Sequence, residues 1–189
     1  MGSIILARHG EPALSRKVRL TSAEYRDWWA RYEVGGLKEA QTPPSRLVAT
    51  ARDAGVILAS TRRRAVETAQ ALAADRAFAQ DEALIEAPLP PPALPRWVKL
   101  SPRHWGVVAR FWWWFSNRHQ EETRVEAQTR ADAVADTLIE RAQNGDDVLV
   151  LAHGFFNTMV GRALRRRGWR CTDDGGYRYW SARRFEKRA

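Results

Sequence analysis

The sequence contains a single cysteine, Cys171, and only four histidines in 189 residues. One cysteine excludes an intramolecular disulfide and a cysteine-based zinc site. No stretch approaches the roughly eighteen apolar residues of a membrane-spanning helix, and no basic segment followed by an apolar run marks a secretion signal. We therefore expect a soluble, cytoplasmic protein without a membrane span.

Acidic residues are scarce beside basic ones, and the formal net charge is +9. The imbalance is concentrated in residues 162–189, which hold ten Lys or Arg and three Asp or Glu. Such a segment can bind nucleic acid or an anionic membrane, or it can form a solvated face. Because no nucleic-acid-binding motif accompanies the charge, we do not expect nucleic acid as a partner.

Short apolar runs at residues 4–6, 56–59 and 148–151 predict buried strands. Uninterrupted runs of this kind are typical of parallel strands that are covered on both faces. Helix patterns and their capping signals separate these runs. They predict helices from Thr21 to Gly35, from Pro43 to Gly55, within residues 60–69, from Glu121 to Gln143 and through residues 156–164. Residues 77–86 read as a loop or short strand, and residues 177–185 as a last edge strand.

This alternation predicts one α/β domain over residues 1–189, a three-layer α/β/α sandwich with a mainly parallel central sheet. Two segments, about 11–43 and 88–120, are expected to form an inserted cap. The six prolines between residues 88 and 102 exclude a regular helix or a central strand there. The aromatic run at residues 110–115 leaves three readings: cap packing, a pocket wall for an apolar substrate group, or membrane contact.

Polar residues follow the predicted strands where the strands end. His9 follows the first strand, His153 follows the third, and three arginines follow the second. The carboxyl ends of parallel strands share one sheet edge, where α/β proteins place their ligand sites, so these side chains can converge. An imidazole nucleophile with cationic neighbours suits phosphoryl transfer. Gly10 permits a sharp turn and a close approach of the backbone to a ligand.

The sequence resembles the histidine phosphatase superfamily, also called the phosphoglycerate mutase-like family, in three stretches. Arg8-His9-Gly10 resembles the motif whose histidine becomes phosphorylated, and Ala152-His153-Gly154 resembles the second histidine motif. Residues 60–69 resemble the segment Ser-x-x-x-Arg-Ala-x-x-Thr-Ala, whose register makes Arg64 the phosphate-binding arginine. The resemblance implies catalytic roles for His9 and His153, phosphate binding by Arg8, Gly10, Arg64 and His153, and no cofactor or metal.

The resemblance also implies a carboxylate that donates a proton to the leaving group, often within Leu-x-Glu. Leu84-Ile85-Glu86 matches this part, and Glu11 and Glu82 are substitutes. The Gly-x-Trp-Glu-Gly segment that often follows is absent, which argues against a phosphoglycerate mutase. Further candidates for substrate binding are Glu11, Arg16, Arg62 and Asn157, although Asn157 could equally orient His153 or cap a helix. Neither His104 nor His119 has a metal-ligand spacing beside it.

Three hypotheses follow. The first is a metal-independent phosphomonoesterase that acts on a small phosphorylated substrate through a phosphohistidine on His9. The second is a member of the same fold that binds a phosphorylated ligand with little turnover. The third is a basic protein that binds nucleic acid or a membrane surface. Neither the substrate nor the oligomeric state follows from the sequence.

Overall fold

The computed structural model describes residues 1–115 and 122–187, and within them six strands form one sheet. In chain order they are β1 (Ile4–Arg8), β2 (Val56–Ser60), β3 (Ala79–Asp81), β4 (Val148–Ala152), β5 (Trp169–Asp174) and β6 (Ala182–Lys187). The order across the sheet is β3-β2-β4-β1-β6-β5. The first four are parallel, whereas β6 runs antiparallel to β1 and β5 antiparallel to β6. The predicted mainly parallel sheet is confirmed.

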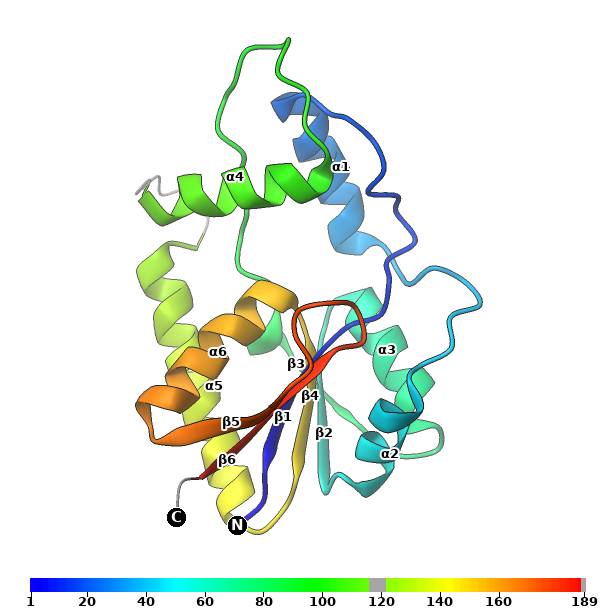
Figure 1. Cartoon of the computed structure of the whole chain (residues 1–189), viewed down its shortest axis with the longest axis vertical. Coiled ribbons are helices and arrows are strands. Elements are labelled where there is room, and N and C mark those ends of the chain that lie inside the picture. The colour runs from blue at the N-terminus through cyan, green and yellow to red at the C-terminus, as the bar shows by residue number, and fades with distance from the viewer. Residues whose placement is uncertain (116–121, 188–189) are drawn as a thin grey trace.

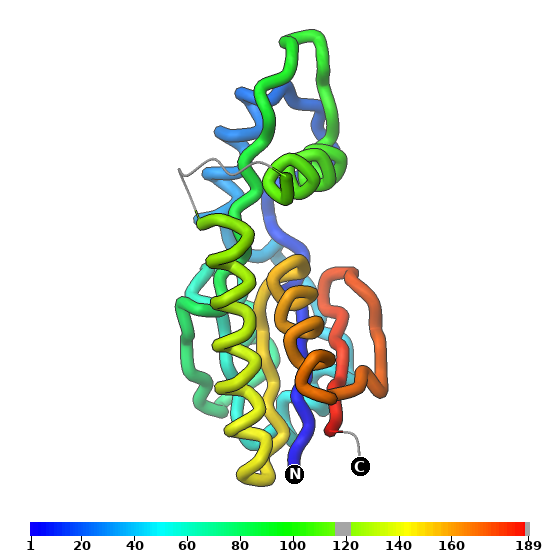
Figure 2. The backbone as a smooth tube through the Cα atoms, turned by 90° about the vertical axis from the view of Figure 1, so that its left-hand side faces the viewer, coloured from blue at the N-terminus to red at the C-terminus, as the bar shows by residue number. Residues whose placement is uncertain are grey.

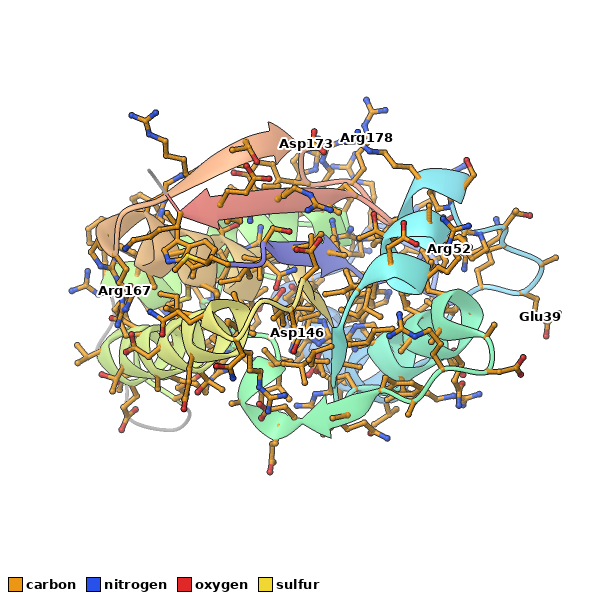
Figure 3. The ribbon with its side chains drawn as sticks, turned by 90° about the horizontal axis from the view of Figure 1, so that it is seen from below. Glu39, Arg52, Asp146, Arg167, Asp173 and Arg178 are labelled. Carbon is orange, nitrogen blue, oxygen red and sulfur yellow. The ribbon has the colours of Figure 1, made fainter. Side chains whose placement is uncertain are left out.

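Helices cover both faces of this sheet (Figure 1). Helices α2 (Ser45–Asp53) and α3 (Arg63–Ala73) lie on one face, and α5 (Arg124–Gln143) and α6 (Gly154–Arg166) on the other. Successive residues of β1 alternate between the two cores, with Ile4 and Leu6 facing α5 and α6 and Ile5 and Ala7 facing α2 and α3. The view from below shows the same three layers (Figure 3). A strand buried on both faces needs the uninterrupted apolar run that the sequence displays.

Two further helices, α1 (Ser22–Val34) and α4 (Pro102–Phe115), lie beyond the carboxyl ends of the parallel strands (Figures 1 and 2). We call these helices and the loops that join them to the sheet the cap. The cap has an aromatic core of its own, and the segments before α1 and α4 pair at Leu20 and Leu100. The buried members of that core are Tyr25, Trp28, Tyr32, Leu89, Trp105 and Ala109.

The aromatic run is split between two environments. Trp113 is buried against the main core, whereas Phe111 and Phe115 are exposed on the outer side of α4. Cap packing therefore accounts for only part of the run. In the described ranges 1–115 and 122–187, no helix has the length and apolar character needed to cross a bilayer.

Two expectations about secondary structure are corrected. Pro102 does not lie in an extended segment but is the first residue of α4. Proline is well tolerated there, because the amide of the first helical residue has no partner within the helix. The last strand, β6, begins only at Ala182 and lies between β1 and β5 rather than at the edge. The edge strand is β5, which the sequence analysis missed; the short 3-10 turn at Glu82–Leu84 is also new.

The predicted start of the first helix agrees with the structure. Thr21 caps α1 in a capping box with Glu24, as its sequence pattern predicts. Helix α5 begins at Arg124, after the cap residue Thr123. The predicted start at Glu121 lies outside the described residues, as do the end of the proposed cap segment and His119.

The basic segment 162–189 is built into the main domain as far as residue 187. Arg167 at the end of α6 pairs with Asp132 and Asp136 of α5, and Figure 3 shows it at the periphery of the helical layer. Arg183 is buried in β6, and Arg184 pairs with Asp147. These arginines are therefore part of the fold, whereas Arg162, Arg165, Arg166, Arg170 and Arg178 are exposed to solvent. The expectation that nucleic acid is not a partner stays a prediction.

Candidate active site

His9 follows β1 directly, and its side chain is only 2% exposed. Its Nδ1 lies 2.7 Å from the carbonyl oxygen of Gly10. A carbonyl oxygen only accepts, so Nδ1 carries the ring proton and Nε2 keeps its lone pair. Burial, and then the charges of Arg64 and Arg8, hold the pKa of His9 well below its usual value. The ring is therefore neutral near pH 7, with one nitrogen free to attack an electrophile.

Gly10 continues the chain beneath the ring of Trp180. A Cβ atom at position 10 would lie 2.4 Å from Cζ2 of Trp180, so no larger side chain fits without a shift. The amide of Gly10 donates to Oγ1 of Thr68, and that hydroxyl donates to the carbonyl oxygen of Arg64. The sequence motif thus requires glycine because the indole covers this turn.

His153 precedes α6 and is buried beside His9, with 5.2 Å between the ring centroids. Its Nδ1 lies 3.3 Å from Nη2 of Arg64, and its Nε2 lies 2.9 Å from Oγ of Ser60. A guanidinium only donates, so Nδ1 accepts and Nε2 carries the proton. Burial and the charge of Arg64 lower the pKa of His153 well below its usual value. This environment suits a neutral imidazole that donates a hydrogen bond from Nε2 better than a cationic one.

Arg64, in the first turn of α3, is fully buried and held by residues of the cap. Its guanidinium donates to the carbonyl oxygen of Tyr32 at 2.9 Å and pairs with the carboxylate of Glu33 at 2.8 Å. Its Cζ also lies 4.5 Å from the centre of the Tyr32 ring. The same carboxylate of Glu33 pairs with Arg62 at 3.0 Å. Arg64, and not Arg62, is the arginine in contact with His153, as the motif register predicts.

Arg8 and Arg16 meet on the ring of Tyr179, which lies in the loop between β5 and β6. Arg8 lies over that ring with its Cζ 4.3 Å from the centre, and Arg16 donates to the Tyr179 hydroxyl at 2.7 Å. The same ring lies 5.7 Å from that of His9, centre to centre. The β5–β6 loop thus reaches the end of the sheet where α6 begins (Figure 1).

Glu86 lies at the start of α6. Its two carboxylate oxygens accept hydrogen bonds from the backbone amides of Phe156 at 2.7 Å and Phe155 at 3.3 Å. A carboxylate is well placed at a helix N-terminus because free amides and the helix dipole both favour it there. Phe155, which donates to Glu86, is two residues after His153 in the chain. Glu86 therefore lies at the rim of the histidine pair.

The remaining candidates lie farther from the pair or bind elsewhere. Glu11 and Glu82 are exposed, and the backbone of Glu11 bonds to Gln41. Asn157 is buried, and its amide donates to the carbonyl oxygen of Ala7 at the end of β1. Asn157 therefore joins α6 to the strand that carries His9, a positioning role. No cluster of three or more His, Cys, Asp or Glu side chains suited to a metal occurs in residues 1–115 and 122–187.

The structure thus gathers Arg8, His9, Gly10, Arg64 and His153 as the sequence predicts, with Glu86 at their edge. The sequence analysis missed two members, Glu33 and Tyr179. Neither belongs to a motif, and each arrives from an element that is distant in the chain. Only the folded arrangement of the cap and the β5–β6 loop identifies them.

Comparisons with known proteins agree with this geometry. The family model of the histidine phosphatase superfamily (branch 1) matches residues 4–172, whereas no curated protein matches the chain. Among solved structures, YhfR from Bacillus stearothermophilus is 22% identical with a TM-score of 0.57, covering 88% of this chain and 81% of its own. A mycobacterial glucosyl-3-phosphoglycerate phosphatase is 20% identical with a TM-score of 0.56, covering 87% and 80%.

A third structure, phosphoserine phosphatase from Entamoeba histolytica in complex with 3-phosphoglyceric acid, is 17% identical with a TM-score of 0.55. The alignment covers 88% of this chain and 81% of that one. Likeness at these identities concerns the fold, which matches the α/β sandwich described above. The family match spans most of the chain and includes both histidines and the arginine between them in sequence. On this evidence, the chain belongs to the histidine phosphatase superfamily, branch 1.

Proposed function

We propose that this protein is a metal-independent phosphomonoesterase that forms a phosphohistidine on Nε2 of His9. The observation that supports this most directly is the hydrogen bond between Nδ1 of His9 and the carbonyl oxygen of Gly10. It fixes the tautomer whose Nε2 is unprotonated, and the lowered pKa of His9 keeps that nitrogen available. The solved relatives include phosphatases that act on small phosphorylated molecules, which favours a substrate of that kind.

The proposed reaction has two displacements. In the first, Nε2 of His9 attacks phosphorus, the bond from phosphorus to the ester oxygen breaks, and an acid protonates the departing alkoxide. In the second, the oxygen of water attacks phosphorus, the bond from phosphorus to Nε2 breaks, and a base takes a proton of that water, so that inorganic phosphate and the free imidazole of His9 are formed. Arg8 and Arg64 stabilise the phosphoryl oxygens through both steps, and the Nε2 proton of His153 joins them when it turns from Oγ of Ser60 to a phosphoryl oxygen.

Glu86 is our candidate for the acid and then the base. It accepts hydrogen bonds at the N-terminus of α6 from the amides of Phe155 and Phe156, which follow His153 by two and three residues. Protonation matters most for a poor leaving group, so E86Q should slow hydrolysis of an alkyl phosphate by about 10²-fold or more. The kcat/KM for p-nitrophenyl phosphate, which reports the first displacement alone, should fall much less, because nitrophenolate leaves without a proton. Equal losses on both substrates would instead indicate that Glu86 acts only by capping α6.

The phosphohistidine itself is the decisive test. Wild-type protein is mixed with a phosphate ester carrying labelled phosphorus, quenched in base, and digested to locate acid-labile label on His9. The His9→Ala variant should carry no label and lose turnover, whereas the matched His104→Ala variant, changed at an exposed histidine, should keep both. Turnover in wild type should also survive treatment with a chelator. Full turnover by the His9→Ala variant would end this proposal.

A second candidate is a phospholigand-binding member of the fold with little turnover. It is favoured by one observation: both oxygens of Glu86 are engaged by backbone amides and must release one to reach a leaving group. This candidate expects tight phosphate binding with negligible hydrolysis across a broad panel of monoesters. Turnover that falls in the Glu86→Gln variant would favour the enzyme.

A further inference from the structure

Guanidinium groups outnumber carboxylates around the histidine pair and the adjacent start of α6, where Arg110 lies over the ring of Phe155. Arg8, Arg16 and Arg110 take part in no ion pair within residues 1–115 and 122–187, whereas Arg62 and Arg64 share the single carboxylate of Glu33. Counting Glu86 as well, five arginines face two carboxylates. Five guanidinium charges and two carboxylate charges leave three net positive charges. A phosphate monoester carries two negative charges, so one positive charge remains uncompensated when it binds.

Arg16 reaches this region from the first part of the cap. Its Nη1 donates to the Tyr179 hydroxyl, and the Tyr179 ring lies beside both His9 and Arg8. Arg16 is therefore separated from the proposed nucleophile by a single aromatic ring. Its charge also contributes to the lowered pKa of His9.

Arg110 approaches from α4, on the side of α6. Its Cζ lies 5.0 Å from the centre of the Phe155 ring, and Phe155 is two residues from His153. Trp113, one turn farther along α4, packs edge-on against the same ring at 5.9 Å. The aromatic contact fixes where the guanidinium lies while leaving its hydrogen-bonding edge for another group.

Tyr25 lies within electrostatic reach of both arginines. Its side chain is fully buried, stacked against Trp105 at 5.6 Å and Trp28 at 5.8 Å. Its hydroxyl has no hydrogen-bond partner among the residues that the structure describes. Burial raises the pKa of Tyr25, and the charges of Arg110 and Arg16 oppose that rise. A buried hydroxyl that lacks a partner is costly, which makes it a strong donor to any acceptor that enters.

We propose that Arg16, Tyr25 and Arg110 form a second anion subsite, so that the substrate is a small phosphomonoester carrying a further anionic group, a carboxylate or a second phosphate. The phosphoryl group would lie between His9, His153, Arg8 and Arg64. The second group would accept hydrogen bonds from the cap. This inference rests on the proposed function and adds the class of substrate to it.

Non-hydrolysable phosphonates test the inference by binding alone. Calorimetric titration compares methylphosphonate with ω-phosphonocarboxylates of increasing chain length, from phosphonoacetate to 6-phosphonohexanoate, and with propane-1,3-diphosphonate. We expect at least one probe with a second anionic group to bind about tenfold or more tightly than methylphosphonate, the gain of one charge-assisted contact. The length at which the gain peaks measures the separation of the two groups.

Variants then assign the gain to the subsite. Arg110→Gln and Tyr25→Phe should each remove most of the gain, whereas Arg103→Gln, which deletes the same charge from the exposed face of α4, should keep it. The inference is overturned if no probe with a second anionic group binds more tightly than methylphosphonate, or if Arg103→Gln loses the gain as fully as Arg110→Gln. Binding of these probes needs no turnover. A protein that hydrolyses no ester but binds the probes with two anionic groups more tightly would therefore contradict the proposed hydrolysis and leave the second subsite standing.

Discussion

Glu33 at the end of α1 forms an ion pair of 2.8 Å with Arg64 at the start of α3. The pair joins the cap to the arginine that contacts His153. The Arg64 guanidinium is almost fully buried, and a buried charge is strongly destabilising unless it is paired. The cap thus holds one side chain of the proposed phosphate site in place.

Replacing Glu33 with Gln should therefore lower the free energy of unfolding by about 1–3 kcal/mol. The amide can still accept a hydrogen bond, but it no longer compensates the charges of Arg64 and Arg62. Urea denaturation measures the change. Glu140→Gln, an exposed change on α5, serves as the matched control and should stay within about 0.5 kcal/mol of wild type. A Glu33→Gln protein as stable as that control would show that the backbone carbonyls alone hold Arg64.

The kcat/KM of hydrolysis should stay high at mildly acidic pH. Because the pKa of His9 is lowered well below 6.5, its ring stays neutral at pH values where an ordinary histidine is protonated. The acidic limb of kcat/KM that reports His9 should accordingly lie below pH 6.5. Arg8→Gln removes one cation that depresses this pKa, and the limb should move toward higher pH. A limb that moves toward lower pH, or does not move, would contradict the assignment.

Stability should fall as the pH drops below about 6.5. Both buried histidines have lowered pKa values, so in this range the unfolded chain binds protons that the folded chain does not. Each histidine then reduces the free energy of unfolding by up to about 1.4 kcal/mol per pH unit, until its folded-state pKa is reached.

Denaturation at several pH values between 7.5 and 5 tests this linkage. His153→Asn cannot titrate, so its stability should depend less on pH than that of wild type. His104→Asn, at an exposed histidine, is the comparison, and the same reduction in both variants would refute the linkage.

Gly10→Ala should destabilise the fold and reduce turnover, because the added methyl group meets the Trp180 ring. Overpacking of this kind costs about 1–3 kcal/mol. Trp180→Leu in the same chain makes room for the methyl group and should recover part of that loss. A double-mutant cycle measures the coupling, and strictly additive effects would show that the two residues do not clash.

Much of the site could be predicted from the sequence, because His9 and His153 directly follow buried strands and belong to short motifs. The runs before His9 and His153 are buried on both faces, so their apolar character is visible in one sequence. Strand β5 was missed because its residues alternate in burial at a sheet edge, and α4 because five nearby prolines obscure the helix that Pro102 begins. Glu33 and Tyr179 could not be found, since only tertiary packing brings them to the site.

Strand β1 has neighbours from late in the chain. It pairs with β4 (Val148–Ala152) on one side and β6 (Ala182–Lys187) on the other. Pairing over such sequence separations carries a large loop-closure cost and slows folding. During synthesis, the apolar strand before His9 must therefore stay unpaired until residues 148–187 have been made. The proposed nucleophile thus leaves the ribosome long before the two strands that flank its own.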